Sequence, residues 1–160
     1  MIYTHSHREE FVFNLLDQIG INNYRDMSEE EVAYQLGIFI NKTNKASHCQ
    51  QSGRFRAIYL NIDLDPKQRR LEFFHELGHL LRSIPGAHLL PTALKDFMEW
   101  DAQHFEFYAA MPYKMMDEFD LNDPQVVYHL SDSFCVPESY VIKKLQFIRE
   151  KQAQYQLLTK

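Results

Sequence analysis

At 160 residues the chain has the length of one domain built around a single core. Apolar residues make up 45% of it and charged residues 24%, which is typical of a globular protein in water. The net charge of −5 argues against a surface that binds nucleic acid on its own. No apolar run is long enough for a signal peptide or a membrane span, so we expect a cytoplasmic protein without a membrane partner.

The two cysteines, Cys49 and Cys135, lie far apart in the sequence and form no CxxC pair. This spacing favours neither a disulfide framework nor a zinc site built from cysteines. We therefore interpret both as free thiols in a reducing compartment.

Two helices are predicted near the N-terminus. Residues 8–20 have helical spacing and end at Gly20. Ser28 and Glu31 form a capping box for a second helix, which closes on Gly37.

Short apolar runs then replace the helical spacing. Residues 38–40 and 55–62 are rich in β-branched and aromatic side chains and predict two strands of a small sheet. The polar residues 41–53 between them are expected to form an exposed loop.

The second half of the chain is predicted to be helical. Asp65 and Pro66 open a long helix that ends near Ser83, because aspartate is a good N-cap and proline suits the first turn. Further helices are expected over residues 92–110, 123–130 and 138–152. Strands in the first half and helices in the second indicate an α+β domain. We expect one domain over residues 1–160, with a core of about residues 1–112 and a C-terminal helical segment over 113–160.

The last two predicted helices have the spacing of a helix-turn-helix pair. Basic residues gather in the final one, namely Lys143, Lys144, Arg149 and Lys151. In a chain of net negative charge we interpret the pair as a packing element with a solvated basic face, and direct binding to DNA is not expected.

The most informative segment is LEFFHELGHLL, residues 71–81. His75 and His79 are four residues apart, so a helix projects them side by side, where two imidazoles can bind one metal ion. Glu76 lies about 100° further around the helix, where its carboxylate can act on a water molecule rather than on the ion. The apolar neighbours Phe73, Phe74, Leu77, Leu80 and Leu81 would anchor the opposite side in a core.

A zinc site of this kind needs a third protein ligand. The metzincin pattern is excluded, because Arg82 and Pro85 stand where it requires glycine and histidine. A carboxylate from the next helix is the remaining option. We favour Glu99, since a carboxylate in such an apolar stretch would need a partner if it were buried. The alternatives are Asp101, followed by His88, His104 and Glu106.

The motif and the helix after it resemble the ImmA/IrrE family of zinc metallopeptidases. That family has HELGH on one helix and then a segment reading like E-x-E-A-N-x-F-A-A-x-L-L-M-P. Its positions are matched here without a gap by Glu99, Asp101, Ala102, Phe105, Met111 and Pro112. The resemblance covers roughly residues 30–148. It departs at Gln103, where the family has asparagine, and at the pairs Glu106-Phe107 and Ala109-Ala110, which replace A-A and L-L.

The resemblance implies a zincin-like fold, with a small sheet, the HExxH active-site helix and C-terminal helices. It implies that His75, His79 and Glu99 hold zinc and that Glu76 is the catalytic general base. It also implies an endopeptidase whose substrate is a protein, such as a helix-turn-helix repressor that controls a mobile element.

The metal, the oxyanion-stabilising group and the function each have alternatives. Manganese or iron could occupy the same ligand set in place of zinc. An oxyanion-stabilising group is expected, with candidates Tyr108, Tyr113, Tyr128 and His129. The alternative function is a metal-binding regulator or sensor that acts by binding a partner without proteolysis.

Overall fold

The structure is a computed structural model that describes residues 3–83 and 89–160. Within these residues it contains six α-helices, three strands and two short 3-10 helices. In chain order the elements are α1 His7–Gln18, η1 Tyr24–Asp26, α2 Glu29–Leu36, β1 Phe39–Thr43, β2 His48–Ser52, β3 Phe55–Asn61, α3 Pro66–Arg82, α4 Thr92–Ala109, η3 Tyr113–Met115, α5 Val126–Phe134 and α6 Glu138–Leu158. The predicted α+β class is confirmed.

The sheet has the strand order β1-β3-β2. Strand β1 is parallel to β3, whereas β2 is antiparallel to it. The prediction of a loop over residues 41–53 is therefore wrong, since this segment contains β2. Its sequence, HCQQS, is almost entirely polar and carries no apolar alternation. A two-residue turn beginning at Gly53, with φ of 59°, pairs β2 with β3 instead.

Both N-terminal helices begin and end close to the predicted positions. The Ser28 side chain accepts a hydrogen bond from the Glu31 backbone N–H at the start of α2. The helix closes at Gly37, which has φ of 66°. Gly20, just beyond α1, also has a positive φ of 75°.

The long helix α3 also begins where the sequence predicts. The Asp65 carboxylate accepts hydrogen bonds from the backbone N–H groups of Lys67 and Gln68 at 2.9 and 3.0 Å. Pro66 is its first residue and Ser83 its C-cap. Its apolar face is fully buried at Phe73, Phe74 and Leu77.

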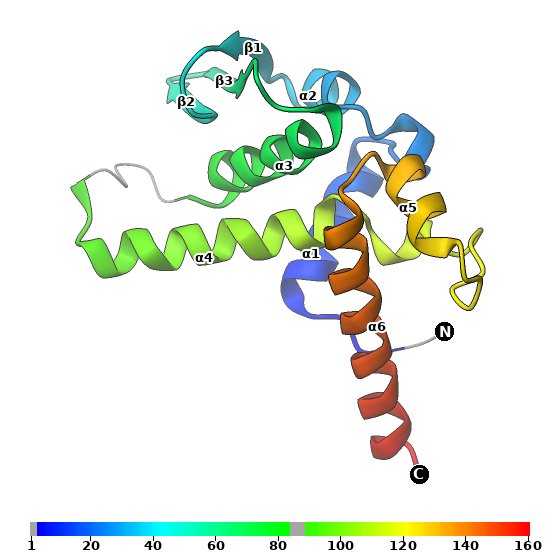
Figure 1. Ribbon diagram of the computed structural model, residues 1–160. Helices are drawn as coiled ribbons and strands as arrows, with labels where there is room; N and C mark the ends of the chain where they lie inside the picture. Colours follow the sequence, from blue (N-terminus) through cyan, green and yellow to red (C-terminus); the bar gives the residue numbers. More distant parts are fainter. Residues whose placement is uncertain (1–2, 84–88) are drawn as a thin grey trace.

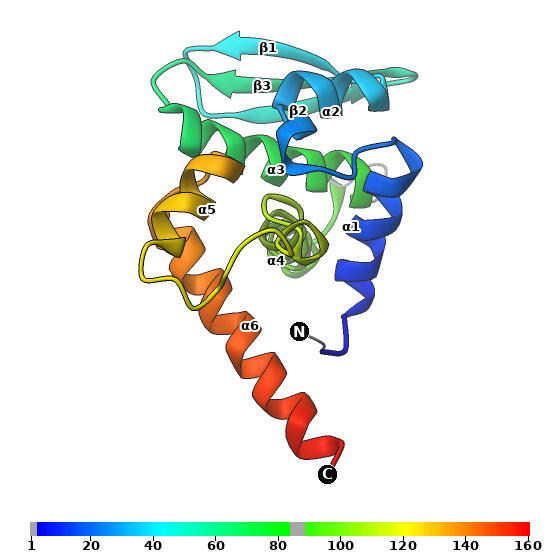
Figure 2. The same cartoon turned by 90° about the vertical axis from the view of Figure 1, so that its right-hand side faces the viewer.

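Helix α3 is the middle one of three layers. The sheet covers one side of α3 and α4 lies along the other (Figure 1). Figure 2 looks along α4 and shows it between α3, α1 and α6. Gly78 allows the close approach of α3 and α4, because a Cβ atom there would lie only 2.9 Å from Cδ1 of Phe105 and 3.3 Å from Cα of Ala102.

The C-terminal helices differ from the prediction in their limits. Helix α5 spans Val126–Phe134. It begins after residue 123 because the Asp123 side chain caps a turn, in which it accepts a hydrogen bond from the Gln125 backbone N–H. Helix α6 continues to Leu158 instead of ending near residue 152, and its far end extends beyond the body of the molecule (Figure 1).

The prediction that Lys144 lies on a solvated basic face of the last helix is wrong, because this residue is fully buried. Its Nζ atom donates a hydrogen bond to the Phe107 carbonyl at 2.8 Å. Burial lowers the pKa of this amine to about 7. Three of the four basic residues named above are therefore left for the surface of α6. Among the described residues, no helix combines the length and apolarity needed to cross a membrane.

Candidate metal centre

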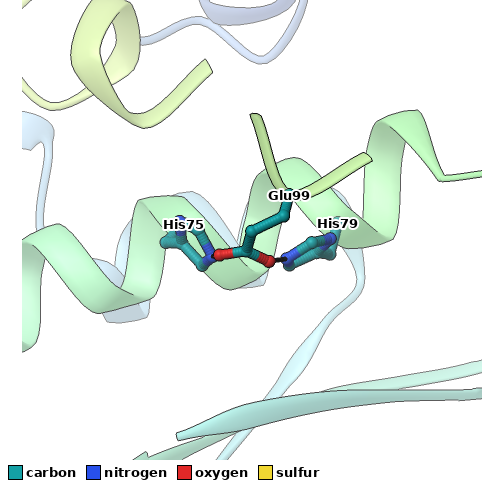
Figure 3. Close-up of side chains that lie close together, drawn as sticks. All are labelled: His75, His79 and Glu99. Atoms are coloured by element: carbon teal, nitrogen blue, oxygen red, sulfur yellow. Dashed lines mark hydrogen bonds and ion pairs between the residues drawn. The ribbon is translucent and has the colours of Figure 1, made fainter. Parts of the chain in front are cut away.

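Two histidines from α3 and one glutamate from α4 meet in the space between the helices (Figure 3). The Glu99 carboxylate lies between the rings, with Oε1 2.9 Å from His75 Nε2 and Oε2 2.9 Å from His79 Nε2. One ligand atom of each residue lies within 4.8 Å of the other two. The structure thus brings together the three residues that the sequence predicted as metal ligands.

The donor set fits a transition-metal ion. Two imidazole nitrogens and one carboxylate oxygen are the ligands of many catalytic zinc sites, where bonds are about 2.0–2.2 Å long. Ligand atoms around a tetrahedral ion of that size are roughly 3.4 Å apart. The two nitrogen–oxygen contacts here, at 2.9 Å, are shorter than this and the ligand atoms span up to 4.8 Å, so small shifts of the side chains would admit one ion.

Helix geometry accounts for this convergence. His75 and His79 are one turn apart on α3, and their rings lie edge to face at 4.9 Å. Glu99 stands near the middle of α4, which packs along α3 at the level of Gly78. The close helix packing at this glycine brings the carboxylate within reach of both rings.

Glu99 is less buried than the sequence argument supposed. Its side chain is 51% exposed, and its apolar neighbours Phe97 and Trp100 are exposed as well. The cost of burial therefore does not explain its position, whereas contact with both histidines does. The metal centre opens to solvent on the α4 side.

Glu106 has a role that the sequence reasoning missed. Its Oε2 lies 3.1 Å from Nδ1 of His75, on the opposite side of the ring from Glu99. A carboxylate there makes Nδ1 the protonated nitrogen and leaves the Nε2 lone pair for a metal ion. This hydrogen bond also raises the pKa of His75, against the effect of burial. The sequence contained a signal for this contact, because residues 99 and 106 are two helical turns apart and share a face of α4.

Glu76 points toward the sheet side of α3. Its carboxylate accepts a hydrogen bond from the thiol of Cys49 on β2. Burial raises the pKa of the Glu76 carboxyl, while the nearby histidines oppose that shift. A carboxyl group of raised pKa, next to the ligand pair, suits a general base. Burial likewise raises the pKa of the Cys49 thiol, to about 12, so this thiol acts here as a neutral donor.

The rival ligands lie elsewhere. Asp101 accepts from Arg8 Nε at 2.7 Å and from Arg82 Nε at 2.5 Å, an ion-pair network on another side of α4. His104 Nδ1 is 2.8 Å from the Trp100 carbonyl oxygen. His88 lies outside the described residues.

A cleft of about 680 Å³ runs beside the centre, between α3 and the turn that links β1 to β2. Its lining combines apolar side chains with three carboxylates and consists of Ala46, Ser47, Asn61, Leu64, Gln68, Leu71, Glu72, His75, Glu76 and Glu106. The four predicted oxyanion candidates are not among these residues. Tyr108 and Tyr113 are buried in the core, whereas Tyr128 and His129 are exposed on α5.

Comparison with known proteins places the centre in a family. Residues 33–146 match the family described as Peptidase_M78, IrrE N-terminal-like domain. YqaB, an uncharacterised protein of Bacillus subtilis, is 28% identical over 164 residues, which cover 97% of this chain and 91% of YqaB. XkdA, a protein of the phage-like element PBSX of Bacillus subtilis, is 23% identical over 92% of this chain and 76% of its own length.

A solved structure shares the fold. It is that of a Mycobacterium tuberculosis transcriptional regulator, with a TM-score of 0.59 and 15% identity. The match covers 87% of this chain but only 46% of the regulator, so the chain spans about half of that structure. With the family match over most of its length, the resemblance drawn from the HELGH segment is confirmed. The chain belongs to the IrrE N-terminal-like family, whose description as a peptidase family suggests a metallopeptidase.

Proposed function

We propose that the protein is a zinc-dependent endopeptidase whose ion is held by His75, His79 and Glu99. The observation that carries the proposal is the contact of one Glu99 carboxylate with both Nε2 atoms, beside a partly buried Glu76. A bound zinc ion supplies a Lewis acid that lowers the pKa of water and polarises a carbonyl group.

The chain's own residues provide the rest of the reaction. Glu76 takes a proton from the attacking water molecule as the water oxygen bonds to the carbonyl carbon of the substrate. Glu76 then gives that proton to the amide nitrogen as the carbon–nitrogen bond breaks. Glu106 keeps the His75 ring oriented throughout, because it binds the Nδ1 proton.

The cleft beside the centre is where we place the substrate. Its volume and open form suit a peptide segment rather than a whole folded protein. We propose a helix-turn-helix repressor as the substrate, cleaved within an exposed segment. The family resemblance supports this choice, and the similarity to a protein of a phage-like element agrees with a role in a mobile element.

The test is to incubate the zinc-loaded protein with the helix-turn-helix repressor encoded nearest to it. We expect discrete repressor fragments, and none when a chelator is present or when Glu76→Gln replaces the wild type. Fragments that persist with the chelator would overturn the proposal. Stable binding without fragments, with zinc confirmed in the sample, would instead favour a metal-binding regulator that acts by contact alone.

A further inference from the structure

The outer face of the sheet presents aromatic and amide side chains to solvent. The strand register places alternate residues of all three strands on this face, opposite the side that packs on α3. We call this set the outer face and define it by Phe39, Asn41, His48, Gln50, Phe55 and Tyr59. Cys49 and Ile58 are out of phase with it and point toward α3 instead.

The outer face is open. Phe39 is 60% exposed and Phe55 is 41% exposed, although both are large apolar residues. In Figure 1 the sheet forms the top of the molecule and α3 lies beneath it. A few single exposed apolar residues are ordinary on a protein surface, whereas several aromatic rings on one sheet face indicate a binding surface.

The rings form two ordered pairs across neighbouring strands. Phe39 and Phe55 are stacked with centroids 5.5 Å apart and planes at 21°. His48 and Tyr59 are stacked at 4.8 Å and 9°. The Tyr59 hydroxyl also donates to the Gln50 side chain at 3.2 Å. Within each pair the two rings cover one face of each other, so each pair leaves its two outer ring faces for a further flat ring, beside amide donors and acceptors.

The segment that contains the sheet, residues 32–62, has a net charge of opposite sign to that of the rest of the chain. Between Glu31 and Asp63 there is no acidic residue, but there are four basic ones, Lys42, Lys45, Arg54 and Arg56. The remainder then holds 13 of the 17 basic residues and all 22 acidic ones, a net charge of −9. The net charge of the whole chain conceals this separation.

The basic side chains at the ends of the sheet are available to a ligand. Lys45 lies in the turn after β1 and Arg54 in the turn between β2 and β3, and both are exposed. Neither has an ion-pair partner in the described part of the chain. They stand at opposite ends of the outer face, where they could contact successive phosphates of a strand lying across it.

We propose that the outer face binds single-stranded nucleic acid. Unpaired bases would stack on the ring pairs, the amides of Asn41 and Gln50 would contact base edges, and Lys45 and Arg54 would contact phosphates. A duplex hides its base faces and would gain only the phosphate contacts. An acidic protein would use the charges but not the stacking surfaces, so the combination of both favours nucleic acid. The inference does not depend on the peptidase activity.

The test measures fluorescence anisotropy of labelled single strands of about 12 nucleotides, oligothymidylate and oligouridylate, with the full chain at roughly 50 mM salt. We expect both strands to bind, and the corresponding duplex to bind at least tenfold more weakly. The ratio between the two strands shows whether DNA or RNA is preferred. No binding of either strand, or equal binding of the duplex, would overturn the proposal.

Two variants separate stacking from charge. The pair Phe39→Leu and Phe55→Leu keeps apolar side chains but removes the aromatic faces, and we expect about a tenfold loss of affinity or more. The pair Lys45→Gln and Arg54→Gln should lower the slope of log affinity against log salt by about 1.4. Thermal unfolding checks that each variant is folded.

The matched control is the pair Lys143→Gln and Arg149→Gln, which removes two exposed charges from α6. We expect it to keep the wild-type affinity within about twofold. An equal loss in this control would assign binding to general charge or to α6 and contradict the proposal. Unchanged affinity in the variant with Phe39→Leu and Phe55→Leu would show that the rings do not contribute to binding, and it would also contradict the proposal.

Discussion

The metal centre between α3 and α4 and the three-stranded sheet lie close together but gather charged residues of opposite sign. Around the metal centre the acidic residues are Glu72, Glu76, Glu99 and Glu106. The sheet has basic residues and no acidic one. Carboxylates thus gather where a cation is expected, and cations gather where we propose a polyanion. The net charge of a chain is a poor guide to its partners when the two signs occupy different elements.

The largest expected effect separates chemistry from metal binding at the centre. Glu76→Gln removes the general base, so peptidase activity should fall by about a hundredfold to ten-thousandfold. Zinc content, measured by atomic absorption, should stay at the wild-type level, because Glu76 is not among the three converging ligands. Binding of oligothymidylate to the sheet should also be unchanged. Loss of zinc in this variant would make Glu76 part of the ligand set.

The next effect concerns the third ligand. Glu99→Ala should weaken zinc binding by more than about a hundredfold, since the loss of an outer partner alone typically costs about 10–100-fold. A competition titration against a chromophoric chelator measures this. The sheet variant with Lys45→Gln and Arg54→Gln serves as the control and should bind zinc normally. Wild-type affinity in Glu99→Ala would show that another group completes the site.

Glu106 should have a smaller effect on the same titration. Glu106→Ala is expected to weaken zinc binding by about 10–100-fold, because the His75 ring loses the partner of its Nδ1 atom. Glu106→Gln should restore part of this loss, as an amide oxygen still accepts that proton. Glu72→Gln is the matched control, since Glu72 lines the same cleft, whereas the ion pairs of the two histidines in the described residues are with Glu99 and Glu106. Equal losses of zinc affinity in the Glu72 and Glu106 variants would show that zinc binding depends on the charge of the cleft and not on the contact between Glu106 and His75.

The smallest effect concerns stability on the other side of α4. Burial alone would raise the pKa of Asp101, but hydrogen bonds from Arg82 and Arg8 outweigh it and hold the pKa below the ordinary aspartate value. Asp101 therefore stabilises the fold fully above its unfolded pKa, and this contribution is lost as the pH falls through the lower, folded value.

Asp101→Asn should accordingly reduce the free energy of unfolding at neutral pH by about 2 kcal/mol. Urea denaturation at neutral pH and well below the ordinary aspartate pKa measures the change. The difference between variant and wild type should shrink in acid. A constant difference would mean that the ion pairs do not account for it, and a loss of zinc binding would return Asp101 to the list of ligands.

Much of the centre could be predicted because helix periodicity is a local property. The spacing of His75 and His79 fixes their common direction, and the Asp65-Pro66 start fixes the limits of α3. The choice of Glu99 required a match between two helices; the apolar stretch around it favoured this residue, and the family pattern agreed. Glu106 was named only as a remaining ligand candidate, because its contact with Nδ1 depends on how α4 packs against α3.

The sheet was less predictable for a different reason. Strand β2 has no apolar alternation, and its register comes from the turn at Gly53 and from pairing with β3. Missing β2 hid the alignment of His48 with Tyr59, and with it the aromatic outer face. The role of Cys49 was hidden in the same way, because its contact with Glu76 depends on where β2 crosses α3.

Anomalous scattering at the zinc absorption edge, from crystals of the zinc-loaded protein, shows whether His75, His79 and Glu99 hold the ion. We expect one strong peak between α3 and α4, with His75 Nε2, His79 Nε2 and a Glu99 oxygen at about 2.0–2.2 Å. A peak at Asp101 or His104, or no peak between the helices at saturating zinc, would contradict it.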